Sequence, residues 1–424
     1  MSKKKQPRRN RFWLFVVGGI AAILAVLFAL RGEIVASRAR ASLSERDLDS
    51  ALWWLNVGKR ISPKNAECEF LLARLARKKS DVVSMREHLS KAGDLGYSPK
   101  LVQREMWLAL AQSGSLRDAE PHLHEMFRDQ QGDGREICEA FVLGYLSVYR
   151  LDEARGLLAE WINGFPDDPQ PYFLRGIISS DQQDWKPAEE DLRMAIQCKP
   201  DHMAAHLGLA NVLTEIKRPE EAIQHYRIAS TDKEVGASAS VGLAVCLDSS
   251  LDQTDEALKV LQEVLEKDPI NVEALVETAK IQFAAGNYQQ TYDLLAPVVS
   301  QHSRDFDLRH LYATALSKVG KKDEAKEEFA IVRKAKVELD RANKMASKVT
   351  LAPSDIDLRL EVAQIYLKYS SEREGLLWYW SVLDIDPDNR SAHLALAEYY
   401  EAKKPASASD RENARFHRSK SGNS

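Results

Sequence analysis

Apolar residues recur at spacings of three and four along most of the chain after residue 34. This spacing places them on one face of an α-helix, so the pattern predicts a succession of amphipathic helices. Short polar segments such as Ser179–Trp185 and Phe283–Tyr288 separate the apolar runs, and segments of this kind form tight turns. The chain is therefore expected to fold as pairs of helices, each pair joined by a short turn.

The predicted helix pairs repeat with a period of 34 residues. One unit contains Gly176, Ala188 and Leu192 and ends at Pro200. Because the distance between two packed helices depends on the side chains at their contact, the small residues permit a close crossing and the leucine fills the gap beside it. Proline cannot extend a helix, so it marks the end of the unit. The equivalent residues 34 positions later are Ala210, Ala222 and Tyr226.

Units with this phase run over residues 34–402, with some slippage at the start. No unit can bury its apolar face alone, so the units are expected to stack into a continuous array. The interval between Ala313 and Ala363 exceeds one period by 16 residues, which predicts a helical insertion at about 333–352. The insertion is either a lengthened second helix or an additional helix, and it acts either as a hinge or dimerising element or as a tolerated insertion.

The stretch Tyr172–Pro200 resembles the tetratricopeptide repeat family, whose 34-residue pattern is W-x2-L-G-x2-Y…A-x3-F…P. It keeps the small residue, the pair Ala188 and Leu192 and the final proline, whereas Arg175 replaces the leucine. The resemblance implies an all-α fold, a right-handed α-solenoid of about ten stacked helix-turn-helix units. It also implies a scaffold that holds peptides or partner proteins on a concave surface lined by the first helix of each unit.

One flank of each first helix, offset from the packing positions, is the candidate ligand groove. Apolar side chains there, with a polar rim that includes Glu215 and Asp248, suit an extended or helical segment with hydrophobic anchors. The alternative is that the same residues pack against the neighbouring first helix. The candidate groove residues are Phe173, Ile177, Leu207, Asn211, Val241, Val245, Val276, Lys280, Phe283 and His310.

Residues 12–30 are uncharged and almost wholly apolar. A helix of this length spans about 28 Å at roughly 1.5 Å per residue, enough to cross the hydrocarbon core of a membrane. A cleaved secretory signal is the alternative, but the apolar segment exceeds the roughly 7–15 residues typical of such signals. We therefore expect one N-terminal transmembrane helix that anchors the chain.

Basic residues indicate the orientation of this helix. Residues 1–11 contain six Lys or Arg, and basic residues are sparser after the apolar segment. The bias predicts a cytoplasmic tail over 1–11 and places the repeats outside the inner or plasma membrane, in the periplasm of a bacterium. Because both flanks are basic, an array that faces the cytoplasm is the alternative.

Charge is divided unevenly along the 424 residues. Residues 1–40 contain nine Lys or Arg and one Glu, a net +8, which leaves −12 for the rest of a chain whose total is −4. An acidic body argues against a general nucleic-acid binder. Residues 403–424 are polar and almost free of large apolar side chains, so a disordered tail is expected there.

Motifs typical of catalysis and of metal or cofactor binding are missing from the sequence. The four cysteines form no CxxC pair, and His202 and His206 have no nearby carboxylate or cysteine in sequence that would complete a metal set. The motifs G-x-S-x-G, H-E-x-x-H and G-x-x-x-x-G-K-[ST] do not occur. We therefore predict no enzyme activity, no cofactor, no metal and no small-molecule substrate.

The sequence as a whole predicts a membrane-anchored scaffold that binds peptides or proteins in extracytoplasmic envelope or protein-complex assembly. Anchoring raises the effective concentration of such a scaffold for partners in the same membrane. The alternatives are a cytoplasm-facing scaffold for envelope biosynthesis and a non-catalytic subunit of a glycosyltransferase or peptidase.

Overall fold

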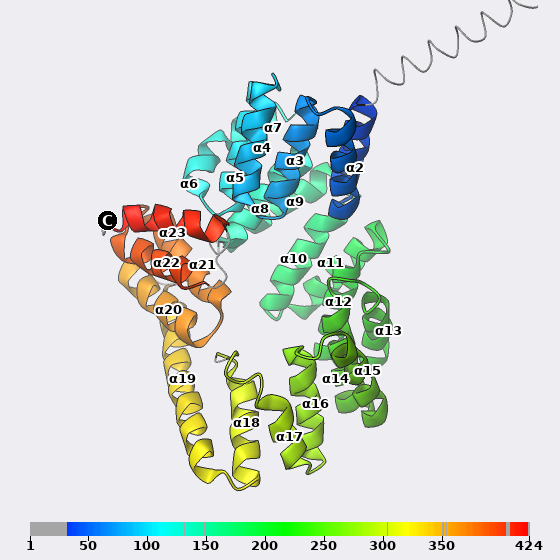
Figure 1. Ribbon diagram of the computed structural model, residues 1–424, viewed down its shortest axis with the longest axis vertical. Coiled ribbons are helices and arrows are strands. Elements are labelled where there is room, and N and C mark those ends of the chain that lie inside the picture. Colours follow the sequence, from blue (N-terminus) through cyan, green and yellow to red (C-terminus); the bar gives the residue numbers. More distant parts are fainter. Residues whose placement is uncertain are drawn as a thin grey trace, which may run out of the picture. The chain divides into compact units, whose positions relative to one another are not determined.

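The computed structural model describes residues 32–130, 132–147, 150–302, 304–349, 352, 354–403 and 408–422 (Figure 1). These residues form helices and short turns, and no β-strand occurs within the described ranges. Contacts divide the chain into two compact units. The first comprises the described residues up to Arg128 together with Ala397–Phe416, and the second comprises Asp129–Leu396 together with His417–Ser424 as far as it is described.

Helices of the first unit follow the helix-turn-helix pattern. Residues 32–44 are helical and are followed by α2. The helices α3 and α4 form the next pair and pack against each other. The second helix of the pair that begins with α5 is broken by a 3₁₀ turn at Glu120–His122, which contains Pro121. The helices are α2 (Leu48–Ile61), α3 (Ala66–Lys78), α4 (Val82–Asp94), α5 (Pro99–Gln112), α6 (Leu116–Ala119) and α7 (Leu123–Arg128).

The second unit continues the same pattern. Each first helix packs against its second helix, and the first helices α10, α12, α14, α16 and α18 also pack against one another in succession. The pairs are α8 (Gly134–Ser147) and α9 (Leu151–Gly164), α10 (Pro169–Asp181) and α11 (Trp185–Cys198), α12 (Met203–Glu215) and α13 (Pro219–Ala229), α14 (Gly236–Leu251) and α15 (Thr254–Lys267), α16 (Val272–Ala284) and α17 (Tyr288–Leu295), α18 (Phe306–Lys318) and α19 (Lys322–Val349), and α20 (Ile356–Tyr369) and α21 (Glu372–Ile385).

Small residues at the helix crossings have the role predicted for them. Leu192 of α11 is fully buried and lies between two glycines of successive first helices. A Cβ atom at Gly176 would lie 2.9 Å from Leu192 Cγ, and one at Gly208 would lie 3.1 Å from Leu192 Cδ2. The side chains of Ala188 and Ala195 are also fully buried beside Leu192. The repeat motif is therefore a packing motif.

The start of α10 shows how a polar residue orders the junction between units. Asp168 is the N-cap residue, and its Oδ1 accepts a hydrogen bond from the Gln170 backbone N–H at 3.1 Å. Its Oδ2 accepts a second from Nε1 of the fully buried Trp161 at 3.1 Å. One carboxylate thus satisfies an open helix end and the indole of the preceding unit.

The inserted residues near 333–352 extend an existing helix. The second helix of that unit, α19, continues from Lys322 to Val349. Ala335, Ala342 and Met345 are buried along its length. Of the two arrangements open from the sequence, the structure has the lengthened second helix.

Residues 408–420 of the C-terminal tail form a helix where the sequence predicts disorder. The structure has α22 (Arg390–Ala402) and then α23 (Ala408–Lys420), and the two helices contain residues of both units. His417 of α23 is 1% exposed, and its Nδ1 lies 2.8 Å from Nδ1 of His393. Lys420 forms an ion pair with Asp388 at 3.0 Å. Polar contacts hold this segment against the preceding residues, so its low hydrophobicity does not indicate disorder.

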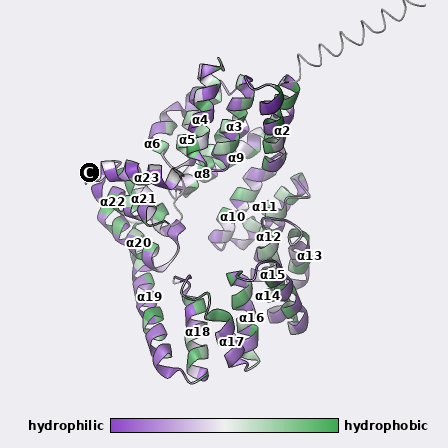
Figure 2. Cartoon of the chain, viewed as in Figure 1, coloured by the Kyte–Doolittle hydropathy of each residue, from purple (hydrophilic) through white to green (hydrophobic). Residues whose placement is uncertain are grey.

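The predicted transmembrane segment at 12–30 and the basic tail at 1–11 lie outside the described residues. Within the part of the chain that is described, no helix has both the length and the apolar character needed to span a membrane. Figure 2 shows hydrophilic and hydrophobic residues interspersed on the labelled helices. This is the distribution of amphipathic helices that bury one face.

Candidate functional site

A cavity of about 740 Å³ lies where the first helices α10, α12 and α14 are neighbours. Residues of these helices, of the turn after α10, of α11 and of α13 form its walls. We refer to it as the α12 pocket. Its lining residues are Ser180, Gln183, Trp185, Asn211, Thr214, Glu215, Tyr226, Gly242 and Val245.

The 34-residue period explains why these side chains meet. Asn211 of α12 and Val245 of α14 are 34 residues apart, and so are Ser180 of α10 and Thr214 of α12. Equivalent positions of stacked units face the same way, so these four side chains share one flank of the array. Two members of the predicted groove, Asn211 and Val245, therefore line the α12 pocket.

Tyr226 reaches the pocket from a second helix. Its ring is 3% exposed, and its hydroxyl donates a hydrogen bond to Asn211 Oδ1 at 2.8 Å. The ring passes beside Gly242 of α14, where a Cβ atom would lie 2.5 Å from Tyr226 Cε1. Burial raises the pKa of the Tyr226 phenol, so the hydroxyl keeps its proton near neutral pH and remains a donor.

The charge of the lining is negative. Glu215 is its one carboxylate, and no Lys, Arg or His belongs to the lining residues that the structure describes. The half-buried indole of Trp185 supplies an aromatic surface. Ser180, Thr214 and Tyr226 add hydroxyl groups. The pocket thus combines one acid, one indole and several hydrogen-bonding groups.

Four other predicted groove residues do not line the pocket. Three of them are partly buried against the hydrophobic core, and one belongs to that core. Phe173, Ile177 and Leu207 are half-buried and pack against the core cluster, and Phe173 also contacts the His202 ring at 5.0 Å. Val241 is only 7% exposed and belongs to that core. These four residues therefore belong to the core cluster around α12 or border it.

The remaining predicted residues lie on α16 and α18, outside the α12 pocket. Val276 is 8% exposed and packs in the core around α16. Lys280 is exposed and pairs with Glu277 at 2.7 Å. The rings of these helices contact their own neighbours, Phe283 with Tyr288 at 5.0 Å and His310 with Phe329 at 5.4 Å. The structure brings none of these four to the pocket lining.

Several lining residues were not among the predicted groove positions, namely Ser180, Gln183, Trp185, Thr214, Tyr226 and Gly242. Glu215 had been placed on the rim. The period itself could have identified Ser180 and Thr214, because they repeat one helical turn after the predicted positions. The sequence pattern does not distinguish Tyr226 from an ordinary packing residue. Only the structure shows that its hydroxyl group lies at the pocket.

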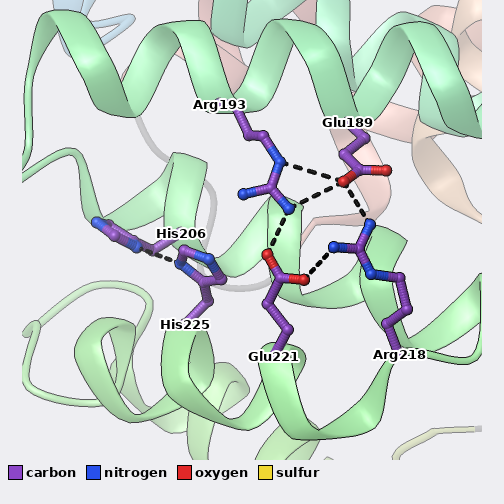
Figure 3. Close-up of polar contacts among 6 residues, drawn as sticks. All are labelled: Glu189, Arg193, His206, Arg218, Glu221 and His225. Carbon is purple, nitrogen blue, oxygen red and sulfur yellow. Dashed lines mark hydrogen bonds and ion pairs between the residues drawn. The ribbon is translucent and has the colours of Figure 1, made fainter.

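A ring of ion pairs joins the second helices α11 and α13 in the same region (Figure 3). Glu189 Oε1 accepts from Arg193 at 2.9 Å and from Arg218 at 2.7 Å. Glu221 pairs with both arginines, and the hydrogen bond from Arg193 is the main cause that lowers the pKa of its carboxyl. The ring therefore links consecutive units through four alternating charges.

Within the described ranges, no group of three or more His, Cys, Asp or Glu side chains is placed to hold a metal ion. Cys68, Cys138, Cys198 and Cys246 are free thiols, and burial raises the pKa of each.

The family model described as "Tetratricopeptide repeat" matches residues 173–235 and 245–290, which include every lining residue of the α12 pocket except Gly242. A search of the curated proteins finds no match.

Solved structures with a similar arrangement include PilW, a type IV pilus biogenesis factor, with 19% identity, 46% of this chain and 90% of that chain covered, and a TM-score of 0.42. A tetratricopeptide repeat protein from Parabacteroides merdae has 18% identity, coverage of 62% and 96%, and a TM-score of 0.39. The tetratricopeptide repeat domain of P58(IPK) has 14% identity, coverage of 92% and 98%, and a TM-score of 0.29. The family match and the packing of Gly176 and Gly208 against Leu192 agree, and residues 173–235 and 245–290 of this chain are tetratricopeptide repeats.

Proposed function

We propose that this protein is a scaffold that binds an extended peptide segment of a partner in the α12 pocket. The observation that carries the proposal is the hydrogen bond from Tyr226 to Asn211 at the pocket wall. It fixes the orientation of the Asn211 amide, because the carboxamide oxygen is the acceptor and the NH₂ group then faces away from the tyrosine hydroxyl.

An oriented amide suits a peptide backbone. Each residue of an extended chain presents one N–H and one C=O that are not paired within the chain. The Asn211 NH₂ group can donate to such a carbonyl, while the oxygens of Ser180, Thr214 and Glu215 can accept from backbone N–H groups. The pocket therefore offers both kinds of partner that an extended backbone requires.

A basic side chain is the best match for the remaining lining. Glu215 supplies a negative charge without a competing cation among the lining residues. An ammonium or guanidinium group over the Trp185 ring would gain cation–π stabilisation of about 0.5–2 kcal/mol. An arginine fits better than a lysine, because its planar group can stack on the indole while its N–H groups bond to the carboxylate.

Binding can be measured with fluorescently labelled peptides and the full chain. Short Ser/Ala peptides with a central Arg, Gln or Glu are suitable probes, and fluorescence anisotropy reports the Kd of each. The arginine peptide is expected to bind at least tenfold more tightly than the glutamate peptide. Asn211→Ala is expected to weaken all peptides, whereas Glu215→Gln should weaken only the arginine peptide.

A matched control is Gln224→Ala, an exposed position of α13 that does not line the pocket. Its Kd should stay within a factor of about two, equivalent to roughly 0.4 kcal/mol. Equal affinity for all peptides, or the same loss in Gln224→Ala as in Asn211→Ala, would contradict the proposal.

Membrane anchoring through residues 12–30, with the repeats in the extracytoplasmic space, is part of the same proposal. Its support is the apolar segment and the charge bias of the sequence. Anchoring would confine the scaffold to membrane-bound partners in envelope or complex assembly. Alkaline phosphatase fused to the C-terminus should be active, whereas an inactive fusion beside an active cytoplasmic reporter would favour the opposite topology.

A further inference from the structure

Two pairs of histidines in this chain have the same geometry. Nδ1 of His206 in α12 lies 2.8 Å from Nδ1 of His225 in α13 (Figure 3). Nε2 of His206 lies 3.0 Å from the Pro200 carbonyl oxygen. Nδ1 of His393 lies 2.8 Å from Nδ1 of His417, and its Nε2 lies 2.8 Å from the carbonyl oxygen of Pro387. Each first histidine stands six residues after the proline that it contacts.

These contacts determine where the protons lie. A carbonyl oxygen can only accept, so Nε2 of His206 must carry the proton that it donates to Pro200. In neutral His206, Nδ1 is then a bare acceptor, and His225 must donate to it from its own Nδ1. The same reasoning gives an Nε2–H proton to His393 and an Nδ1–H proton to His417.

The surroundings of His225 disfavour positive charge on its ring. His206 is 4% exposed and His225 is partly buried. Burial, the neighbouring His206 and the Arg193 guanidinium of α11 lower the pKa of His225, while Glu221 on its own helix opposes them. His202 lies at the N-cap of α12, one turn before His206.

The ring of Glu189, Arg193, Arg218 and Glu221 limits how much these carboxylates help a protonated histidine. Both carboxylates already bind both arginines. A proton on the histidine pair would therefore compete with guanidinium groups for Glu221, the acid that faces His225.

We propose that the His206–His225 pair is a proton-sensitive lock between α12 and α13 that controls the α12 pocket. The lock itself stands on the geometry of the pair, and its effect on a ligand rests on the proposed peptide binding. Tyr226 follows His225 directly in α13, and the two residues make the side-chain hydrogen bonds that join α13 to His206 and Asn211 of α12.

Protonation would open the lock in two steps. The first proton can enter at the second nitrogen of His225, and the resulting imidazolium still donates through Nδ1 to His206. The second proton must enter at Nδ1 of His206, where it places one N–H against another and two positive charges side by side. The hydrogen bond is then lost, and movement of α13 away from α12 separates the Tyr226 hydroxyl from Asn211.

Imidazole ¹⁵N chemical shifts of the full chain, recorded from pH 8 to pH 4, test the lock directly. Single His→Gln variants assign the signals, and the exposed His302 serves as an internal reference. At pH 7.5 we expect the Nε2–H form for His206 and the Nδ1–H form for His225. The pair should titrate in two coupled steps, and the last step should lie below the pKa of about 6.5 of an unburied histidine.

The opposite tautomers, or two independent one-proton titrations near pH 6.5, would overturn the lock. The pair His393 and His417 repeats the tautomer test in a second place, where the same assignment is expected. A His225→Gln variant retains an N–H donor for His206 but cannot titrate, so it tests the lock without removing the hydrogen bond.

Affinity for the arginine peptide tests the control of the pocket. In the wild-type chain the Kd should rise at least tenfold between pH 7.5 and pH 5, whereas in His225→Gln it should change less than threefold. Coupled titration with an unchanged Kd would overturn the control of the pocket. If no peptide binds at pH 7.5, the proposed function fails, and the ¹⁵N titration still decides whether the lock exists.

Discussion

The Tyr226 hydroxyl donates a hydrogen bond to Asn211 Oδ1 at 2.8 Å, so a second-helix residue that fills the core also reaches the pocket wall. Gly242 makes this possible, because any side chain there would meet the tyrosine ring. One ring therefore has a packing function along its length and a polar function at its end.

Replacing Tyr226 with Phe should separate these two functions. The ring and its packing remain, while the hydroxyl bond to Asn211 is removed, so we expect a loss of about 1 kcal/mol in the free energy of unfolding. The free energy of peptide binding should fall by more than this loss in stability, since the Asn211 amide loses its fixed orientation. Urea unfolding and peptide anisotropy measure the two effects, and wild-type affinity in Tyr226→Phe would contradict the role of the hydroxyl.

Gly242→Ala should destabilise the chain by about 1–3 kcal/mol, because the new methyl group overlaps the Tyr226 ring. The shorter side chain of Tyr226→Leu relieves the overlap. The double variant should therefore be more stable than the sum of the two single changes predicts. A double-mutant cycle from urea midpoints measures this coupling, and strict additivity would show that the two residues do not contact as described.

Leu192→Ala should be among the most damaging single changes in the second unit. The side chain is fully buried between α10 and α12, and its removal leaves a cavity that costs about 2–5 kcal/mol. Met194→Ala, two residues away on the same helix and 37% exposed, should cost less than about 1 kcal/mol. Thermal unfolding followed by circular dichroism compares them, and equal losses would contradict the packing role of Leu192.

The protein should lose stability as the pH falls, because His417 resists protonation in the folded chain. Burial, with a smaller effect from His393, lowers its pKa to about 4, against about 6.5 in an unfolded chain. Between these values the folded chain binds fewer protons than the unfolded chain, so stability decreases as the pH falls. The contribution of His417 to the free energy of unfolding is at most about 3 kcal/mol. It is fully present above about pH 6.5 and is lost as the pH approaches 4.

Unfolding midpoints between pH 7 and pH 4.5 test this dependence. His417→Gln should show a shallower fall in midpoint than the wild-type chain, because its residue 417 no longer titrates. His302→Gln, an exposed position, is the control and should follow the wild-type curve. The same slope in His417→Gln and in the wild-type chain would show that His417 does not resist protonation.

The periodicity of the sequence was sufficient to predict which residues pack between the helices of a repeat. Gly176, Ala188 and Leu192 contact each other as expected, because close packing of two helices limits residue size at the crossing whatever the ligand. Exposure along the groove was less predictable. Val241 and Val276 have the spacing of groove residues, yet the adjacent helices bury them to 7% and 8% exposure.

Polar contacts between positions far apart in the sequence could not be predicted either. Residues 408–420 contain few large apolar side chains, so hydropathy gives no reason for the helix α23. The burial of His417 against His393 depends on a partner 24 residues away, and hydropathy contains no term for such a pair. The same holds for Tyr226 and Asn211, whose hydrogen bond joins two helices at positions with no common spacing rule.

Photo-cross-linking from inside the α12 pocket tests the central claim most directly. A benzoyl-phenylalanine in place of Gln183, a lining residue, should label a biotinylated Ser/Ala peptide with a central arginine. The same group at Ile228, an exposed α13 position outside the lining, is the control. We predict labelling from Gln183 alone, at least tenfold above that of the glutamate peptide and suppressed by unlabelled arginine peptide. Equal labelling from both positions, or of both peptides, would contradict the account.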